Sequence, residues 1–153
     1  MQVEAIARRL EGPELDRLVG ASDIVLDCSD NFATRHAINR ACVRQRKPLV
    51  AGAAIRFDGQ LMVFDLARSD SPCYACLFPE SGESEELRCA VMGVLAPLTG
   101  VIGALQAAEA IKLVSGAGES AAGRLLVVDT KGAEWRSIRI ARDPECAVCA
   151  SVR

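Results

Sequence analysis

Four of the seven cysteines form two C-x-x-C pairs, Cys73 with Cys76 and Cys146 with Cys149. A single pair of this kind can be a redox-active dithiol or half of a metal site. Two pairs offer four thiolates, the usual ligand set of a tetrahedral structural zinc ion. A redox pair usually stands at the start of a helix in a βαβ unit, and neither pair is expected there. We therefore predict a structural zinc site, with dithiol chemistry and inert core thiols as the alternatives.

The spacing of the two pairs indicates what such an ion would do. The pairs lie further apart in the sequence than in a compact zinc ribbon. The ion would therefore join a C-terminal tail, residues 142–153, to the loop that carries the first pair, closing a large loop and restraining the unfolded chain. Because four protein thiolates fill every position, none stays open for catalysis.

A second group of polar residues follows the apolar segment Asp23–Cys28. Asp30 is either a helix cap or a ligand for magnesium-nucleotide, because doubly wound sheets bind ligands where a parallel strand ends and the next helix begins. Arg35 lies one turn into that helix and faces either the same cleft or solvent. These two residues mark a candidate nucleotide site.

The three other cysteines and the single histidine give weaker signals. Cys28 ends a predicted buried strand and Cys42 lies on the apolar face of a predicted helix, so both are interpreted as core residues. Cys89 precedes the glycine-rich start of a long helix, where a helix N-terminus could lower the pKa of its thiol. A packing role is the alternative for Cys89. His36 is assigned no role.

The composition indicates what kind of protein carries these residues. The chain has 153 residues, 50% hydrophobic and 25% charged, which is typical of one globular domain. A net charge of −2 gives no basic excess, so general nucleic-acid binding is not expected. The start lacks the basic-then-apolar pattern of a secretory signal, and seven cysteines cannot all pair within one chain. Both features indicate a reducing cytoplasm.

The order of the expected elements predicts an α/β protein with a mixed sheet, built on a βαβ unit plus antiparallel hairpins. Continuous apolar runs predict buried strands, and Gly-containing turn dipeptides predict the hairpins. The expected elements are a strand at Asp23–Cys28, a helix capped by Ser29 or Asp30 and stopped by Pro48, strands at 48–55 and 59–66 that turn at Asp58-Gly59, and a hairpin at 124–141 that turns at Lys131-Gly132.

Three further segments carry their own expectations. Residues 89–108 contain no charge and are long enough to span a bilayer. Their glycines and Pro97 favour instead a buried helix of a soluble protein, from about residue 96 to 114. Residues 79–88 are acidic and aperiodic, which predicts a mobile surface loop. Residues 3–10 start a helix or form a strand, and a short helix is expected at 13–20.

The candidate residues lie in five segments whose combination is specific. In order, the segments are LDCSDNFATRHAINRAC, PLVAGAAIRFDGQLMVF, SPCYACLFP, GVLAPLTGVIGALQAAEAIKLVSG and PECAVC. This combination resembles the second half of the ThiF/MoeB/HesA enzymes, bacterial relatives of the ubiquitin-activating enzymes, over nearly the whole chain. The resemblance implies the C-terminal half of a Rossmann-like fold in which residues 3–10 form a strand.

The resemblance also implies a chemistry. Members bind MgATP and adenylate the C-terminal Gly-Gly of a ubiquitin-like sulfur carrier, so that sulfur can then replace the adenylate. By match to the motif, Asp30 would hold the magnesium-nucleotide, with Asn31 and Arg35 beside it. Cys89 would fall where the family has a thiol for sulfur transfer. The two C-x-x-C pairs would bind zinc, and the long helix would serve in the core and in a homodimer contact.

One part of the family pattern is missing from these residues. Members carry an earlier glycine-rich nucleotide loop with arginines and a lysine that neutralise phosphates, and phosphoryl chemistry depends on such positioned charge. We therefore expect the C-terminal portion of an adenylating enzyme, inactive alone. Alternatives are a non-catalytic, zinc-stapled module that docks a ubiquitin-like partner, and a relative that modifies a tRNA base or a peptide.

The pathway and the sulfur donor stay open at this point. Some motifs are closer to thiamin-type members and others to molybdopterin-type members, so the two branches are not separated. We expect no rhodanese-like domain after the second cysteine pair. The expected donor is therefore a separate protein, such as a cysteine desulfurase or a rhodanese.

Overall fold

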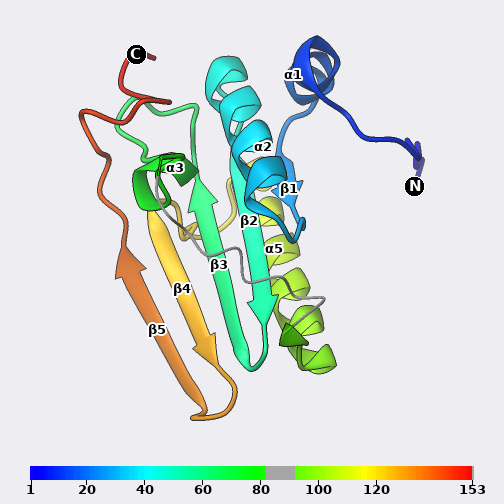
Figure 1. The fold of residues 1–153 in the computed structure, drawn as a ribbon, viewed down its shortest axis with the longest axis vertical. Coiled ribbons are helices and arrows are strands. Elements are labelled where there is room, and N and C mark those ends of the chain that lie inside the picture. Colours follow the sequence, from blue (N-terminus) through cyan, green and yellow to red (C-terminus); the bar gives the residue numbers. More distant parts are fainter. Residues whose placement is uncertain (82–91, 153) are drawn as a thin grey trace.

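A five-stranded mixed sheet, in the order β1-β2-β3-β4-β5, organises the chain (Figure 1). The structure is a computed structural model and describes residues 1–81 and 92–152. The strands are β1 (Val25–Asp27), β2 (Leu49–Ile55), β3 (Asp58–Phe64), β4 (Arg124–Asp129) and β5 (Glu134–Arg139). The helices are α1 (Gly12–Ala21), α2 (Phe32–Gln45), α3 (Tyr74–Leu77) and α5 (Ala96–Ser115).

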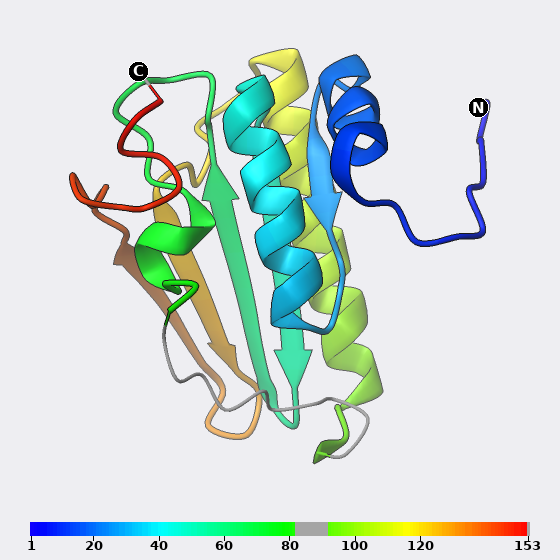
Figure 2. The same ribbon diagram turned by 45° about the horizontal axis from the view of Figure 1, so that its top comes forward.

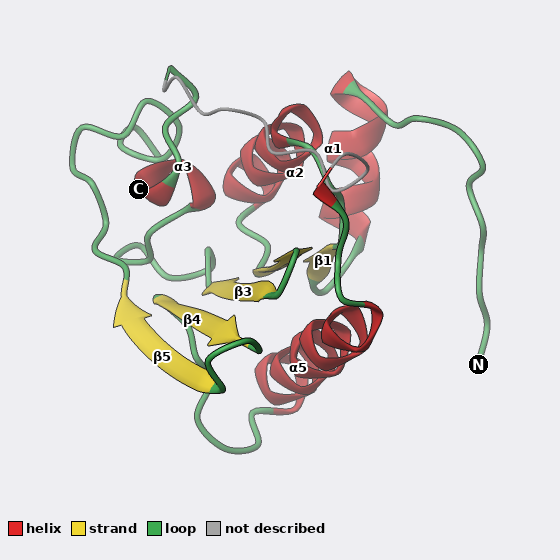
Figure 3. Cartoon of the chain, turned by 60° about the horizontal axis from the view of Figure 1, so that its bottom comes forward, coloured by secondary structure: helices red, strands yellow, loops and turns green. Residues whose placement is uncertain are grey.

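The sheet lies between two helical layers. β1 and β2 pair in parallel through the crossover helix α2, whereas β2, β3, β4 and β5 pair antiparallel. Helix α2 lies in front of the sheet and α5 behind it in Figure 2. Figure 3 shows α1, α2 and α3 together on one side of the sheet and α5 on the other. The predicted α/β fold, with a βαβ unit and two hairpins, is confirmed.

The apolar runs of β2 and β3 are explained by burial on both faces of the sheet. Because neighbouring residues of a strand point to opposite faces, a strand covered on both sides has no polar alternation. Leu49 and Met62 belong to the core on the α2 side, while Val50 and Leu61 pack against residues of α5. All four are at most 1% exposed.

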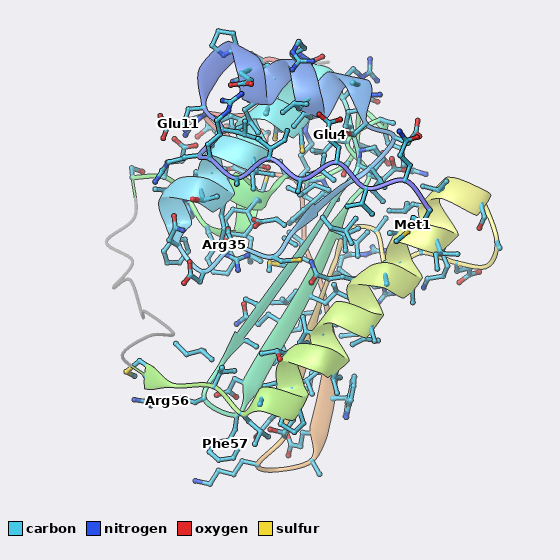
Figure 4. All side chains as sticks on the ribbon, turned by 90° about the vertical axis from the view of Figure 1, so that its right-hand side faces the viewer. Met1, Glu4, Glu11, Arg35, Arg56 and Phe57 are labelled. Carbon is cyan, nitrogen blue, oxygen red and sulfur yellow. The ribbon has the colours of Figure 1, made fainter. Side chains whose placement is uncertain are left out.

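The first hairpin turns two residues earlier than predicted. Ile55 pairs with Asp58, so the turn is Arg56-Phe57, with Arg56 at a φ of 52°. Figure 4 shows these two residues at the end of the sheet, beside the start of α5. Gly59 serves packing instead, because a Cβ there would lie 2.7 Å from Ile102 Cδ1 of α5. The glycine marks a close approach of helix and sheet, which the turn motif alone does not reveal.

Helix α2 has a different cap from the one predicted. The side chain of Asn31 accepts a hydrogen bond from the Thr34 backbone N–H, which is the usual capping contact. Neither Ser29 nor Asp30 caps the helix. At the other end, Arg46 adopts a left-handed conformation with a φ of 52°, so α2 stops before Pro48 is reached.

Helix α5 has the predicted bounds but only part of the predicted burial. Pro97 stands in its first turn and Gly116 ends it with a φ of 69°, as expected. Length and composition would let α5 cross a membrane, and core helices of soluble proteins share both properties. The buried residues of α5 are Leu98, Ile102, Gln106 and Glu109, whereas Ile111 and Val114 are 66% and 62% exposed. The prediction of a buried helix therefore holds for the face that packs on β2 and β3 and fails for the opposite face, which is exposed.

Of the two predictions for the N-terminal segment, one is confirmed and one is wrong. The short helix expected at 13–20 is α1. Residues 3–10 form neither a strand nor a helix, and Val3 is 74% exposed. None of the described strands pairs with this segment, and its side-chain contact to α1 is the ion pair of Arg8 with Glu14. Most of the predicted mobile loop at 79–88 lies outside the described residues.

Candidate functional site

The four cysteines of the two C-x-x-C pairs converge in space. Their sulfur atoms all lie within 4.8 Å of one another. Cys73 Sγ lies 3.8 Å from Cys146 Sγ, and Cys76 Sγ lies 3.5 Å from Cys149 Sγ. Figure 2 shows the C-terminal segment beside α3, the short helix that carries the first pair. A zinc–sulfur tetrahedron with bonds of about 2.3 Å has edges of about 3.8 Å, so the cluster fits that ion.

Hydrogen bonds to the sulfurs support the thiolate state that a metal needs. The backbone N–H groups of Cys73 and Asp143 donate to Cys76 Sγ at 3.4 and 3.5 Å. The Asn39 side chain, fully buried on α2, donates to Cys73 Sγ at 3.6 Å. Metal-binding thiols are commonly held in place by such outer contacts. The cluster is thus built into the core rather than attached to the surface.

The pKa values of the thiols are split by their contacts. The hydrogen bond with the Cys73 sulfur, aided by backbone N–H donors, lowers the pKa of Cys76 to about 5. The same contact and burial raise the pKa of Cys73, and burial raises the pKa of Cys149 to about 11. Packing four sulfurs together therefore makes it hard to ionise them all, unless a cation neutralises them.

The structure bears on the argument that neither cysteine pair starts a helix in a βαβ unit. Cys73 does stand at the start of a helix, because it is the N-cap residue of α3. That position alone would permit a redox pair. However, α3 has four residues and is not the crossover of a βαβ unit. The second pair, brought within 4.8 Å by the fold, favours the metal site over a dithiol.

Arg142 anchors the tail that brings the second pair. It donates to the Ser69 carbonyl at 2.9 Å and to the Cys149 carbonyl at 2.7 Å. The guanidinium thereby bridges the loop before Cys73 and the last turn of the tail. The tail is held by this bridge as well as by the sulfur cluster.

A cavity of about 520 Å³ opens at the ends of β1 and β2. Asp30, Asn31 and Arg35, the three residues of the predicted nucleotide site, all line it. Other lining residues come from both helical layers and the sheet, among them Cys28, Gly52, Asp58, Tyr74, Thr99 and Gln106. The carboxyl ends of parallel strands are where doubly wound sheets bind ligands. The fold therefore gathers the predicted residues at the predicted edge.

The three predicted residues differ in exposure and bonding. Asp30 is exposed, and the Asn31 side-chain N–H donates to its Oδ1 at 3.3 Å. Asn31 also caps α2, so its position is fixed by the helix. Arg35 is 6% exposed and bonds to backbone carbonyls rather than to solvent. Asp30 is thus the acidic group of the three that an incoming ligand can reach.

Comparison with known proteins decides the family. The ThiF family profile matches residues 1–148. The chain belongs to the ThiF family. It is 46% identical over 149 residues, 97% of the chain, to the sulfur carrier protein ThiS adenylyltransferase of Escherichia coli K12. It is 45% identical over 140 residues, 92% of the chain, to the molybdopterin-synthase adenylyltransferase of the same organism.

The chain matches only part of the length of these ThiF-family enzymes. The chain spans 58% of the first enzyme and 55% of the second. Among solved structures, Escherichia coli MccB with ATP superposes with a TM-score of 0.73 at 21% identity, covering 95% of this chain and 45% of MccB. That similarity supports the ThiF-type fold, and the two enzymes of higher identity support the class of adenylyltransferases.

Two residues of this ThiF-family site were missed by sequence reasoning. Asp27, the last residue of β1, is 1% exposed and carries a buried carboxylate next to the cavity. Gln106 of α5 is 3% exposed and donates to the carbonyls of Asp27 and Val50 at 3.0 and 3.1 Å. The available signals were an acid inside an apolar strand and one polar residue inside a charge-free helix segment.

The remaining candidates of the ThiF-family chain have mixed outcomes. Cys42 is fully buried, as predicted, and burial raises the pKa of its thiol to about 12. Cys28 is exposed at the cavity and donates to Gln106 Oε1 at 3.5 Å, so its assignment to the core is wrong. The strand ends before Cys28, which frees its side chain from the core. Cys89 lies outside the described residues.

A glycine on β2 makes the contact of Gln106 possible. A Cβ at Gly52 would lie 2.5 Å from Gln106 Cδ. Replacing Gly52 by alanine is expected to displace the buried amide from its two carbonyl partners and to lower the free energy of unfolding by about 3 kcal/mol. Urea denaturation measures this loss.

A matched control for this prediction lies in α5. Gly100 is exposed in the helix interior, and an added Cβ there meets nothing within 4 Å. Gly100→Ala is expected to raise the free energy of unfolding by about 0.5–1 kcal/mol, because alanine is the better helix former. Equal stability of the Gly52→Ala protein and the parent would contradict the close-packing argument.

Proposed function

We propose that this chain forms the C-terminal part of an ATP-dependent adenylyltransferase that activates the C-terminal Gly-Gly of a ubiquitin-like sulfur carrier. The observation that carries the proposal is the cavity at the ends of β1 and β2, where Asp30, Asn31 and Arg35 come together. The names of the two enzymes compared above, a ThiS adenylyltransferase and a molybdopterin-synthase adenylyltransferase, support the same class of reaction.

The residues at the cavity suit the binding of a metal-nucleotide. Asp30 offers an exposed carboxylate, and carboxylate oxygens are ligands that Mg²⁺ prefers. The N-terminus of α2, capped by Asn31, adds the positive end of a helix dipole at the same place. Magnesium, when bound, neutralises phosphate charge. Asp30 would hold the ion, and the α2 terminus would favour the phosphates.

The reaction proposed here is nucleotide transfer to a carboxylate. The terminal carboxylate oxygen of the carrier attacks the α-phosphorus of ATP, and the bond to the β,γ-diphosphate breaks. The products are an acyl-adenylate and pyrophosphate. Adenylation turns a poor leaving oxygen into a good one, so that a sulfur nucleophile can displace AMP later. A separate protein, such as a cysteine desulfurase or a rhodanese, would supply this sulfur, and Cys89 would take part in the transfer.

The sulfur cluster would have a structural role in this enzyme. Cys73, Cys76, Cys146 and Cys149 would bind zinc through four thiolates, which leaves no position for a substrate. The ion would join the tail, residues 142–153, to α3. Zinc can thus stabilise the fold without taking part in adenylation.

We also propose a dimer and a cellular location. The outward face of α5 exposes apolar side chains, including Ile111 and Val114, and a second copy of the protein could cover them. A reducing cytoplasm would keep the four ligand thiols available for zinc. Membrane insertion and general nucleic-acid binding are not part of this proposal.

A second candidate function is docking of a ubiquitin-like partner without catalysis. One observation favours it: Trp135 and Ile138 on β5 are 61% and 50% exposed. Exposed aromatic and aliphatic side chains on an edge strand are typical of interaction sites. The two candidates predict different behaviour towards ATP.

Carrier-dependent ATP–pyrophosphate exchange tests the proposal. The assay would compare this chain alone, the complete gene product, and the complete product with a carrier that lacks its terminal Gly-Gly. We expect exchange in the complete product with the intact carrier, and none with the shortened carrier, because the nucleophile is then missing. Binding of the carrier without exchange in either protein would leave the docking function and overturn the enzyme.

A further inference from the structure

A buried carboxylate lies directly beside the turn that carries Asp30. Asp27 ends β1 and is 1% exposed. Its Oδ1 accepts hydrogen bonds from the Ser29 backbone N–H at 2.9 Å and from the Ser29 hydroxyl at 2.7 Å. The side chain of Asp27 therefore determines how the chain turns as it leaves the sheet.

Arg35 holds the same turn from the opposite side. It points from α2 toward the sheet in Figure 4 and is 6% exposed. Its Nη2 donates to the carbonyl of Ser29 and, at 2.8 Å, to the carbonyl of Gly52 on β2. Its Nη1 lies 3.7 Å from Asp27 Oδ2. Ser29 is thus fixed at its N–H, its hydroxyl and its carbonyl by two buried charged side chains.

The stability of the fold does not explain this pair. Among the described residues, neither Asp27 Oδ2 nor Arg35 Nη1 has a hydrogen-bond partner. Burying two charges costs desolvation energy, and a contact at 3.7 Å without a hydrogen bond recovers little of it. Apolar residues of similar volume are often equally stable or more so at such places. A role in fixing geometry accounts for the pair better than a contribution to stability.

The opposite layer of the fold restrains the same strand end. Gln106 of α5 donates to the Asp27 carbonyl at 3.0 Å. The end of β1 is therefore held from α2 on one face and from α5 on the other. Asp30 and Asn31 follow immediately, and Asn31 is fixed as the cap of α2. Asp30 sits on a short connection whose two ends are both fixed.

We propose that Asp27 is a positioning residue of the adenylation site. Together with Arg35 it holds Ser29 so that Asp30 faces the cavity in one geometry. This proposal rests on the adenylation function proposed above. It gives Arg35 an indirect role, because its Nη2 donates to two backbone carbonyls and its Nη1 faces the Asp27 carboxylate.

The test uses Asp27→Asn in the complete gene product. Asparagine keeps the size of the side chain and one acceptor oxygen, but it removes the charge that faces Arg35. We expect kcat of carrier-dependent exchange to fall by about 10²-fold, because displacing a ligand group by about 1 Å has effects of this size. The Mg²⁺ concentration needed for half-maximal rate should rise, while carrier affinity and zinc content stay unchanged.

Two measurements do not depend on turnover. Binding of Mn²⁺-ATP, followed by the electron paramagnetic resonance signal of the ion, should weaken in Asp27→Asn. Hydrogen exchange at the Ser29 amide should become faster, since its acceptor is less well held. Ser29→Ala removes a single side-chain hydrogen bond of the turn and should lower kcat by about fivefold. This second variant decides the question if Asp27→Asn does not fold.

Asp129→Asn is the matched control. Asp129 also ends a strand, β4, and its Oδ1 accepts from the N–H groups of Lys131 and Gly132 at 2.8 and 2.9 Å. It does not line the cavity. We expect unchanged kcat, Mg²⁺ requirement and Mn²⁺-ATP binding. Weakening a turn of the same kind at a strand end away from the cavity should therefore leave exchange activity and metal-nucleotide binding intact.

The outcomes separate this proposal from the adenylation function. An active parent whose Asp27→Asn and Ser29→Ala variants keep the parent's kcat and Mg²⁺ requirement would overturn the positioning role alone. A parent that shows no exchange would overturn the adenylation function. In that case Mn²⁺-ATP binding still tests whether Asp27 positions the metal-nucleotide site. Weaker binding by Asp27→Asn than by the parent supports this role. Equal binding by the two proteins, or no binding by either, rejects it.

Discussion

Replacing Cys73 by serine is expected to release the metal and to lower the free energy of unfolding by about 4 kcal/mol or more. Cys73 is fully buried, contacts the sulfurs of Cys76 and Cys146, and accepts a hydrogen bond from Asn39. Serine is a poor zinc ligand, and the three remaining thiols would stay crowded without a cation. The C-terminal tail would then no longer be joined to α3 through a shared metal ion.

Two measurements check this expectation. Zinc content per chain, from elemental analysis of the purified protein, should be near one in the parent and near zero in Cys73→Ser. Urea denaturation gives the change in the free energy of unfolding, and chelation of the parent should produce a similar loss.

Cys42→Ser is the matched control for burial. Cys42 is also fully buried, but it does not belong to the sulfur cluster. This variant should lose stability through its buried hydroxyl while it keeps its zinc. Retention of a full zinc equivalent by Cys73→Ser would contradict the four-cysteine site.

The sequence predicted those features that depend on local pattern. The apolar runs of β2 and β3, the proline and glycine at the two ends of α5, and the hairpin centred on Lys131-Gly132 are all found in the structure. Each depends on residues that lie next to one another in the chain. The two cysteine pairs are the exception, because their spacing predicted a contact between distant segments that the structure confirms.

The errors arose where distant segments decide the outcome. Gly59 looks like a turn residue, but it serves the packing of Ile102 against the sheet. Burial of α5 depends on what covers the face that does not pack on β2 and β3, and the local sequence pattern of the helix does not predict such a covering. Residues 3–10 are apolar enough for a strand, yet none of the described strands pairs with them.

The candidate site shows the same division. Asp30, Asn31 and Arg35 were found from a motif, and the structure brings them to one cavity. Asp27 and Gln106 have no motif of their own, and their importance appears only when β1, α2 and α5 meet. Cys28 was assigned to the core because β1 was expected to be longer than it is.

Replacing Asp30 by alanine in the complete gene product is expected to lower kcat of ATP–pyrophosphate exchange by about 10²- to 10³-fold. The exposed carboxylate would no longer hold the ion that neutralises phosphate charge. Because Asp30 is exposed and does not cap α2, the free energy of unfolding and the zinc content should not change. Exchange rates at saturating carrier, with Mg²⁺ varied, measure the effect.

Asp23→Ala provides the control for this last substitution. Asp23 is also an exposed aspartate near β1, but it precedes the strand and does not line the cavity. Its removal should leave exchange unchanged. Carrier binding should survive Asp30→Ala under both proposed functions, so only the exchange reaction separates them. An active parent whose Asp30→Ala variant still exchanges at the parent's rate would place the metal-nucleotide elsewhere, whereas a selective loss would tie catalysis to the turn that Asp27 and Arg35 hold.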